Sequence, residues 1–170
     1  MLSSARLRVA PIAPRHARAM LAGTPEPDLA WADGFPLPSV RGALERIVAA
    51  AAAGRTLEPY FAYAIVRLAD GLAIGDAGFH GPPDADGEVE IGYALVPVAR
   101  GTGLATEATG LLVAWACGQP GVRRVSARVS PANAPSRRVL ERLGFARDGE
   151  VGGLERFLLY PPRVCATLCR

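Results

Sequence analysis

The sequence predicts a mixed α/β (α+β) fold, in which a single domain over residues 1–170 forms one sheet with helices on its faces. Three observations lead to this prediction. Short apolar runs typical of strands recur along the chain, and runs with helical spacing lie between them. The length of 170 residues fits one domain and leaves little room for two. Half of the residues are hydrophobic and 21% are charged, which excludes a disordered chain.

The first elements are one strand and one helix. The strand is LRVAP, residues Leu7–Pro11, and it ends at a proline. The helix is Pro14–Ala22, which has proline in its first turn and Gly23 as its end. A long proline-rich stretch, Thr24–Pro38, is then expected to be a loop.

A second helix and three consecutive strands follow. Ser39 is expected to cap a helix that runs to Ala53 and ends at Gly54. An Asp-Gly turn and the polar turn GPPDADG separate the strands, and Pro97 ends the last of them. The three strand patterns are Pro59–Leu68, Leu72–Phe79 and Glu88–Val96.

The last part of the chain alternates helices and strands. Its longest pattern is a helix over Thr102–Gly118, in which apolar residues recur at helical spacing. The remaining predicted elements are a strand over Val122–Ser130, a helix over Asn133–Leu143, and strands over Phe145–Arg147 and Glu155–Tyr160. The order β-α-α-β-β-β-α-β-α-β-β describes one mixed sheet.

Composition excludes several functions. The chain has no lysine, so all 19 basic residues are arginine, and mechanisms that need a Schiff-base or P-loop lysine are excluded. The formal charge is +3 with scattered arginines, which predicts no nucleic-acid partner. No apolar run is long enough for a membrane span, and the N-terminus lacks the apolar core of a signal peptide, so a cytoplasmic protein without a membrane partner is expected. Arginine in place of lysine is typical of GC-rich, bacterial coding.

The cysteines predict neither disulfides nor a metal site. Their number, three, is odd, and Cys117 lies in an apolar helical run that indicates core. Cys165 and Cys169 lie near the end of the chain without a second pair of ligands. No metal is therefore expected.

The segment EVEIGYALVPVARGTGLATEATGLLVAW, residues Glu88–Trp115, carries the chemistry. A strand ends at a proline, a turn with two glycines follows, and a helix begins directly after it. Free N–H groups of residues Gly101 to Thr106 would lie at the positive end of the helix dipole, which suits a phosphate or pyrophosphate. An ordinary strand-to-helix turn with a glycine-rich cap is the alternative.

Among phosphate-binding patterns, only one matches every fixed position. A Walker A loop needs a lysine. A dinucleotide fingerprint needs a third glycine where Thr106 stands, and an acid that the next strand, VRRVSARVS, does not contain. The acyl-coenzyme A pattern Arg/Gln-x-x-Gly-x-Gly/Ala is matched by Arg100, Gly103 and Ala105.

With these residues the chain resembles the Gcn5-related N-acetyltransferase (GNAT) superfamily, in the branch that includes the ribosomal-protein alanine N-acetyltransferases. Two segments carry the resemblance: EIGYALVPVARGTGLATEA, residues 90–108, and SPANAPSRRVLERLGF, residues 130–145. The resemblance implies a central, mostly antiparallel sheet that splays between its fourth and fifth strands, with helices on both faces.

The resemblance also implies a binding site for acetyl-CoA. Backbone groups of Leu95 would pair with the pantetheine arm, and a backbone N–H of Leu95 or Val96 would meet the oxyanion. Asn133 would reach the pantetheine, although it also suits a helix N-cap. The pyrophosphate would be held by Arg100, Gly101, Thr102, Gly103, Leu104, Ala105 and Thr106.

For the reaction, the resemblance implies a base and a group near the leaving thiol. Glu90 is the predicted base, with a charge at the strand edge as the alternative. Ser136 is the predicted hydrogen-bond donor to the sulfur, because Leu140 stands where many relatives carry a tyrosine acid; a surface hydroxyl is the alternative. An α-amine with a pKa of about 7.8 is about 14% neutral at pH 7 and needs only a weak base.

Acceptor selection is expected from the Thr24–Pro38 loop, the helix after it and the chain near Gly149–Glu155. Trp31 and Phe35 are predicted either to line its pocket or to anchor the loop on the core, and His80 is a second titratable group near the predicted base, or a solvated turn histidine.

The predicted function is acetyl transfer from acetyl-CoA to a primary amine, on a peptide or protein N-terminus or a small molecule. The amine would attack directly in a ternary complex, because neither segment contains a cysteine nucleophile. The alternative is an inactive acyl-CoA-binding sensor or interaction domain. The acceptor's identity stays open, and so does assembly, although proteins of this kind are often homodimers.

Overall fold

A computed structural model describes residues 1–161. Cys165 and Cys169, considered above as metal ligands, lie outside the described residues. The strands are β1 (Leu2–Ser3), β2 (Leu7–Pro11), β3 (Ala62–Arg67), β4 (Ala73–Phe79), β5 (Glu88–Leu95), β6 (Arg124–Val129), β7 (Ala146–Val151) and β8 (Leu154–Leu159). The helices are α1 (Pro14–Ala22), α2 (Arg41–Ala52), α3 (Leu104–Cys117) and α4 (Ala134–Arg142), with short 3₁₀ turns η1 (Pro38–Val40) and η2 (Pro97–Ala99).

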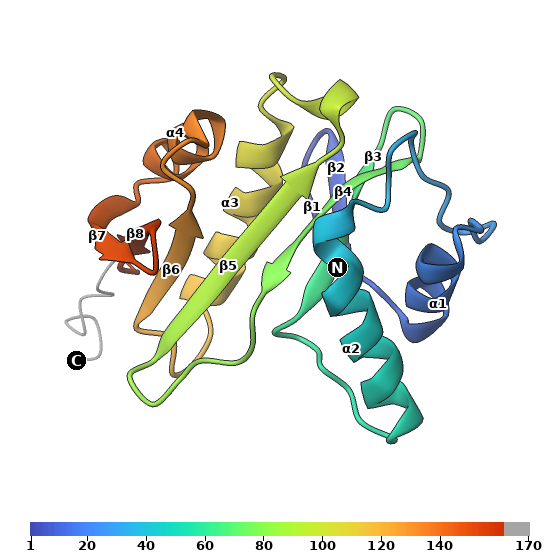
Figure 1. The fold of residues 1–170 in the computed structure, drawn as a ribbon, viewed down its shortest axis with the longest axis horizontal. Coiled ribbons are helices and arrows are strands. Elements are labelled where there is room, and N and C mark those ends of the chain that lie inside the picture. The colour runs from blue at the N-terminus through green and yellow to red at the C-terminus, as the bar shows by residue number, and fades with distance from the viewer. Residues whose placement is uncertain (162–170) are drawn as a thin grey trace, which may run out of the picture.

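The strands form one sheet in the order β1-β2-β3-β4-β5-β6-β8-β7. Every neighbouring pair is antiparallel except β5 and β6, which are parallel because helix α3 connects them. Helices α1 and α2 lie in front of the sheet in Figure 1, and α3 lies behind it. The predicted mixed sheet with helices on both faces is confirmed.

The predicted splay lies between β5 and β6, the fourth and fifth strands of the sequence analysis. These strands pair only from Glu88 to Glu90, opposite residues 124–126 of β6. Strand β5 then continues to Leu95 with β4 as its only paired neighbour in the described sheet. The separation is visible in Figure 1, where β5 and β6 diverge toward their carboxyl ends.

Several predicted boundaries are wrong. Ser39 does not cap α2: it lies within η1, and the residue before the helix is Val40, which makes no side-chain cap bond. Strand β3 begins at Ala62 rather than Pro59. Strand β7 extends to Val151, beyond the predicted end at Arg147, and every one of its residues is exposed, so no apolar alternation marks it.

Two glycines allow close packing around the middle of β4. A Cβ at Gly75 would lie 2.2 Å from the carbonyl oxygen of Ala94, and one at Gly78 would lie 2.1 Å from that of Phe61. Side chains at these positions would collide with backbone, so glycine is required on both sides of Asp76. The chain around Asp76 is therefore held tightly against β3 and β5.

No helix in residues 1–161 combines the length and the apolar character needed to cross a membrane.

Candidate functional site

A cleft of about 550 Å³ opens where β5 and β6 separate. The end of β5, the turn before α3, the first turn of α3 and one side of α4 line it. The lining residues are Tyr93, Ala94, Leu95, Ala99, Arg100, Gly101, Gly103, Leu104, Ala105, Thr106, Asn133, Pro135, Ser136, Arg138, Val139 and Arg142. We refer to it as the splay cleft.

The first turn of α3 faces this cleft with free hydrogen-bond donors. The helix begins at Leu104, so the amides of Leu104, Ala105 and Thr106 have no acceptor within the helix. Gly101 and Gly103 have φ of 78° and 82°, a conformation that side chains disfavour. The Thr106 hydroxyl is buried without a hydrogen-bond partner. These donors and the helix dipole suit an anion.

The end of β5 presents one backbone amide to the gap. Val96 N–H donates to the Ile74 carbonyl at 2.9 Å, and His80 N–H donates to the Glu90 carbonyl at 3.0 Å. Antiparallel hydrogen-bonded pairs recur at every second residue, so Leu95 directs its backbone groups away from β4 and toward the gap. Of the two predicted oxyanion donors, Leu95 is available, whereas Val96 is fully buried, hydrogen-bonded and outside the cleft lining.

Three arginines line the splay cleft, and none of its lining residues is acidic. Arg100 donates from Nε to the Leu95 carbonyl at 2.9 Å. Arg138 and Arg142 lie one turn apart on α4, are exposed, and have no ion-pair partner among residues 1–161. Neither arginine was predicted from the sequence as a site residue, although their spacing on a predicted helix was the available signal.

Thr102 lies outside the cleft lining, unlike its neighbours. Its hydroxyl donates to the Ala99 carbonyl at 2.9 Å, and its own carbonyl accepts from Arg6 at 3.1 Å. Its side chain therefore braces the turn. Any part in binding would fall to its backbone amide.

Asn133 lines the cleft and also caps α4. Its side-chain oxygen accepts from the Ser136 amide at 3.1 Å, which confirms the N-cap interpretation. Contact with an acyl donor stays a prediction.

Ser136 has a phenol beside it. The Tyr93 hydroxyl lies 2.9 Å from the Ser136 hydroxyl and donates to the Ser136 carbonyl at 3.1 Å. Burial raises the pKa of Tyr93, although its hydrogen bond to Ser136 opposes this. Leu140, at the position where many relatives have tyrosine, is fully buried. Its side chain packs in the core and not in the cleft. Tyr93 was not predicted from the sequence as a site residue.

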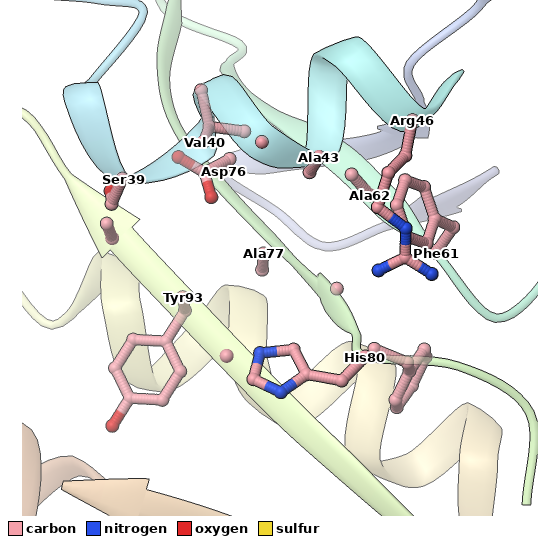
Figure 2. A pocket seen from close by; sticks show the side chains of 15 residues that line it. Ser39, Val40, Ala43, Arg46, Phe61, Ala62, Asp76, Ala77, His80 and Tyr93 are labelled. Carbon is pink, nitrogen blue, oxygen red and sulfur yellow. The ribbon is translucent and has the colours of Figure 1, made fainter. Parts of the chain in front are cut away.

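A second cleft of about 550 Å³ lies on the other side of β5, between α2 and β4. Its lining residues are Ser39, Val40, Gly42, Ala43, Arg46, Phe61, Ala62, Asp76, Ala77, Gly78, Phe79, His80, Gly92, Tyr93 and Ala94. Figure 2 shows the Asp76 carboxyl beside Ser39 and Val40, and the His80 ring and Arg46 farther along the cleft. We refer to it as the α2 cleft. It shares Tyr93 and Ala94 with the splay cleft.

Asp76 is the acid of the α2 cleft. Its Oδ1 atom is buried without a hydrogen-bond partner, and burial raises the pKa of Asp76 to about 7. Asp76 was not predicted from the sequence as a site residue. The available signal was an acid within the otherwise small and apolar strand AIGDAGF.

Glu90 is held by cations. Arg128 donates to both carboxylate oxygens, at 2.9 and 2.8 Å, and His80 Nδ1 lies 3.3 Å from Oε1. Burial opposes its ionisation, but His80 and Arg128 outweigh burial and lower the pKa of Glu90 to about 2. Glu90 lines neither cleft, whereas His80 lines the α2 cleft.

The predicted aromatic residues of the loop pack on the core. Phe35 is buried, and its ring makes an edge-to-face contact with that of Trp31 at 6.4 Å between centroids. Trp31 also bridges to Ala73 of β4. Neither residue lines the α2 cleft, so the geometry favours the anchoring alternative over the acceptor-pocket one.

Residues 1–161 contain no group of three or more His, Cys, Asp or Glu side chains arranged to hold a metal ion.

Residues 6–146 match the model of the acetyltransferase (GNAT) domain family. The chain is 38% identical over 81 residues to the uncharacterized N-acetyltransferase YjdG of Bacillus subtilis, a match covering 48% of each protein. The chain thus spans about half the length of the curated relatives it matches.

Two solved structures illustrate the shared fold. An acetyltransferase from Agrobacterium tumefaciens is 26% identical, with a TM-score of 0.64 over 94% of this chain and 93% of that chain. A ribosomal-protein-S5-alanine acetyltransferase from Vibrio fischeri has a TM-score of 0.69 over 96% of this chain and 98% of that chain. At 18% identity, the second likeness concerns the fold alone.

Proposed function

The chain belongs to the GNAT acetyltransferase family, and on that basis we propose that it transfers an acetyl group from acetyl-CoA to a primary amine by direct attack in a ternary complex. The observation that carries the proposal is the meeting of two clefts. The splay cleft offers anion-binding donors, the α2 cleft is open to a second molecule, and both include Tyr93 and Ala94.

The splay cleft fits the diphosphate of acetyl-CoA. The unpartnered Thr106 hydroxyl and the free amides of residues 104–106 are the donors such a group requires. Arg138 and Arg142 add positive charge from the facing helix, where phosphates of the nucleotide would lie. When bound, acetyl-CoA supplies an acetyl group activated as a thioester.

The Leu95 amide would orient the acyl group. It points into the gap between β5 and β6, on the same strand as Ala94, which both clefts share. A fixed N–H donor at this point stabilises negative charge on the carbonyl oxygen in the transition state.

Tyr93 and Ser136 would act beside the leaving sulfur. Because the phenol donates its one proton to the Ser136 carbonyl, the Ser136 hydroxyl keeps its own proton and can donate it into the cleft. A proton held there stabilises the departing thiolate without a tyrosine at position 140. Tyr93 would therefore assist Ser136 in its predicted role as hydrogen-bond donor to the sulfur.

The role of Glu90 as base stays a prediction. Its ion pair with Arg128 makes Glu90 a weak base. Such a base suits only a substrate whose amine is itself weakly basic. The same pair would also hold His80 at the end of the α2 cleft.

Coenzyme A release tests the proposal. Millimolar acetyl-CoA should raise the melting temperature, and at least one class of amine should release free thiol. Stabilisation without thiol release from any amine would favour the inactive acyl-CoA-binding alternative, and the absence of both would refute the assignment.

A further inference from the structure

The strand register places Asp76 where the two clefts meet. Asp76 is the partner of Ala94 across β4 and β5, and the pair is of the hydrogen-bonded type. In such a pair the Cα atoms lie about 5.5 Å apart. Asp76 therefore lies directly across from Ala94, the residue before Leu95, whose amide points into the gap.

The carboxyl of Asp76 has no counterion of its own. No ion pair or hydrogen bond involves its side chain within residues 1–161, and Oδ1 is sealed from water. Burial without a cation is the reason that its pKa lies near neutrality, at about 7. A carboxyl in this state accepts a proton readily at physiological pH, and a cationic ligand would supply the missing partner.

Glu90 differs in both position and charge environment. Its cross-strand neighbour is His80. Glu90 itself lies four residues before Ala94 on β5, which is about 13 Å at the usual rise of a strand. Its carboxylate is also neutralised by Arg128. Of the two carboxyl groups, Asp76 is nearer to the shared residues and is the stronger proton acceptor.

We propose that Asp76 is the catalytic residue that takes the proton from the acceptor amine, and that the α2 cleft selects acceptors that carry a single primary ammonium group. This inference rests on the proposed acetyl transfer. The ammonium gives one proton to the Asp76 carboxylate and becomes a neutral amine. Its lone pair forms the C–N bond as the C–S bond breaks, the sulfur leaves with the bonding pair and takes up a proton, and the nitrogen releases its second proton to water.

The other polar groups of the cleft support a singly charged acceptor. Arg46 faces the cleft from α2, His80 from the end of β4, Tyr93 from β5 and Ser39 from η1. The Arg46 guanidinium lies 4.6 Å over the Phe61 ring and has no acidic partner among residues 1–161. The cleft lining thus carries one carboxyl and one arginine without an acidic partner, so a second ammonium on the acceptor would be repelled by that arginine.

Asp76→Asn tests the inference with the full-length protein and saturating acetyl-CoA. We expect kcat with a peptide α-amine to fall at least about 100-fold at pH 7, with acetyl-CoA affinity unchanged. The rise in wild-type kcat through pH 7, measured at saturating acceptor, should move in Asp76→Asn to the higher pH at which the amine itself loses its proton, but persist in Glu90→Gln. Asp86→Asn, at an exposed carboxylate outside both clefts, should match wild type. A peptide α-amine should be preferred to spermidine.

The outcomes separate this inference from the proposed function. Wild type without thiol release on any amine refutes both. An active wild type with Asp76→Asn within about threefold of it, or loss of the rise in Glu90→Gln alone, refutes the role of Asp76. Spermidine as the better substrate refutes the proposed selectivity. Should Asp76→Asn fail to fold, the test is Asp76→Ala assayed with added formate, which can replace the missing carboxylate. Acetyl transfer restored by formate supports a proton acceptor at this position, and no restoration in a folded protein refutes it.

Discussion

The two clefts have similar volumes, but backbone groups contribute most to one and side chains to the other. The splay cleft is formed by backbone amides, glycines and arginines of β5, α3 and α4. The α2 cleft is formed by side chains from four separate segments, with Asp76 as its acid. Backbone donors serve an invariant ligand such as a diphosphate, because their geometry is set by the helix itself. Side chains set the chemistry of a cleft whose ligand differs from one protein to another.

Ala105→Glu should give the largest effect. It tests whether the backbone amides of the splay cleft bind the diphosphate. A carboxylate in the first turn of α3 favours the helix but repels a bound diphosphate. The affinity for acetyl-CoA, measured by calorimetry, should fall about 100-fold or more, which is close to 3 kcal/mol. Ala105→Gln has nearly the same size without the charge and should bind within a few-fold of wild type. Unchanged affinity in Ala105→Glu would exclude this turn as the diphosphate site.

Asp76→Asn should change stability in the direction opposite to its effect on activity. The folded-state pKa of about 7 lies above the ordinary 3.8, so the wild-type free energy of unfolding should fall as pH rises from about 4 to 7. Asparagine has no charge to desolvate, and the variant should be more stable than wild type by about 4 kcal/mol at pH 8. Denaturant unfolding at pH 4 and 8 provides its own control, because the difference should shrink at pH 4. A difference that does not depend on pH would contradict the raised pKa.

Tyr93→Phe probes the residue that belongs to both clefts. Loss of its hydrogen bond to Ser136 should lower kcat about tenfold with little change in KM for either substrate. Ser136→Ala should have a similar effect, and the double variant should be no worse than either single one, because the two groups act as one unit. Fully additive losses would show that the phenol and the serine act independently.

Arg138→Gln and Arg142→Gln should have the smallest effects. Each arginine is exposed and screened, so each change should raise KM for acetyl-CoA about fivefold at low salt and less at high salt. Arg123→Gln, at an exposed arginine outside both clefts, is the matched control. Salt-independent effects would argue against a role for these charges in binding phosphates.

Much of the fold was predictable because its signals are local. Gly23, with φ of 72°, ends α1 as expected, and the strand patterns of β2 and β5 match to within a residue. The errors fall where local signals are weak or misleading. Ser39 has the chemistry of a cap, but a 3₁₀ turn begins ahead of it at Pro38. Strand β7 is exposed on both faces and so lacks a pattern.

The sequence by itself determined the turn before α3, whose free amides suit an anion, since the free amides of a helix start depend only on residues 100–106 and their neighbours. Only the tertiary structure decided which carboxyl is paired and which is not. Glu90 meets Arg128, 38 residues away, while Asp76 lies beside η1, opposite Ala94, and its Oδ1 atom is buried without a partner. The ionisation of a carboxyl depends on charges and solvent within a few ångströms, and distant segments supply both.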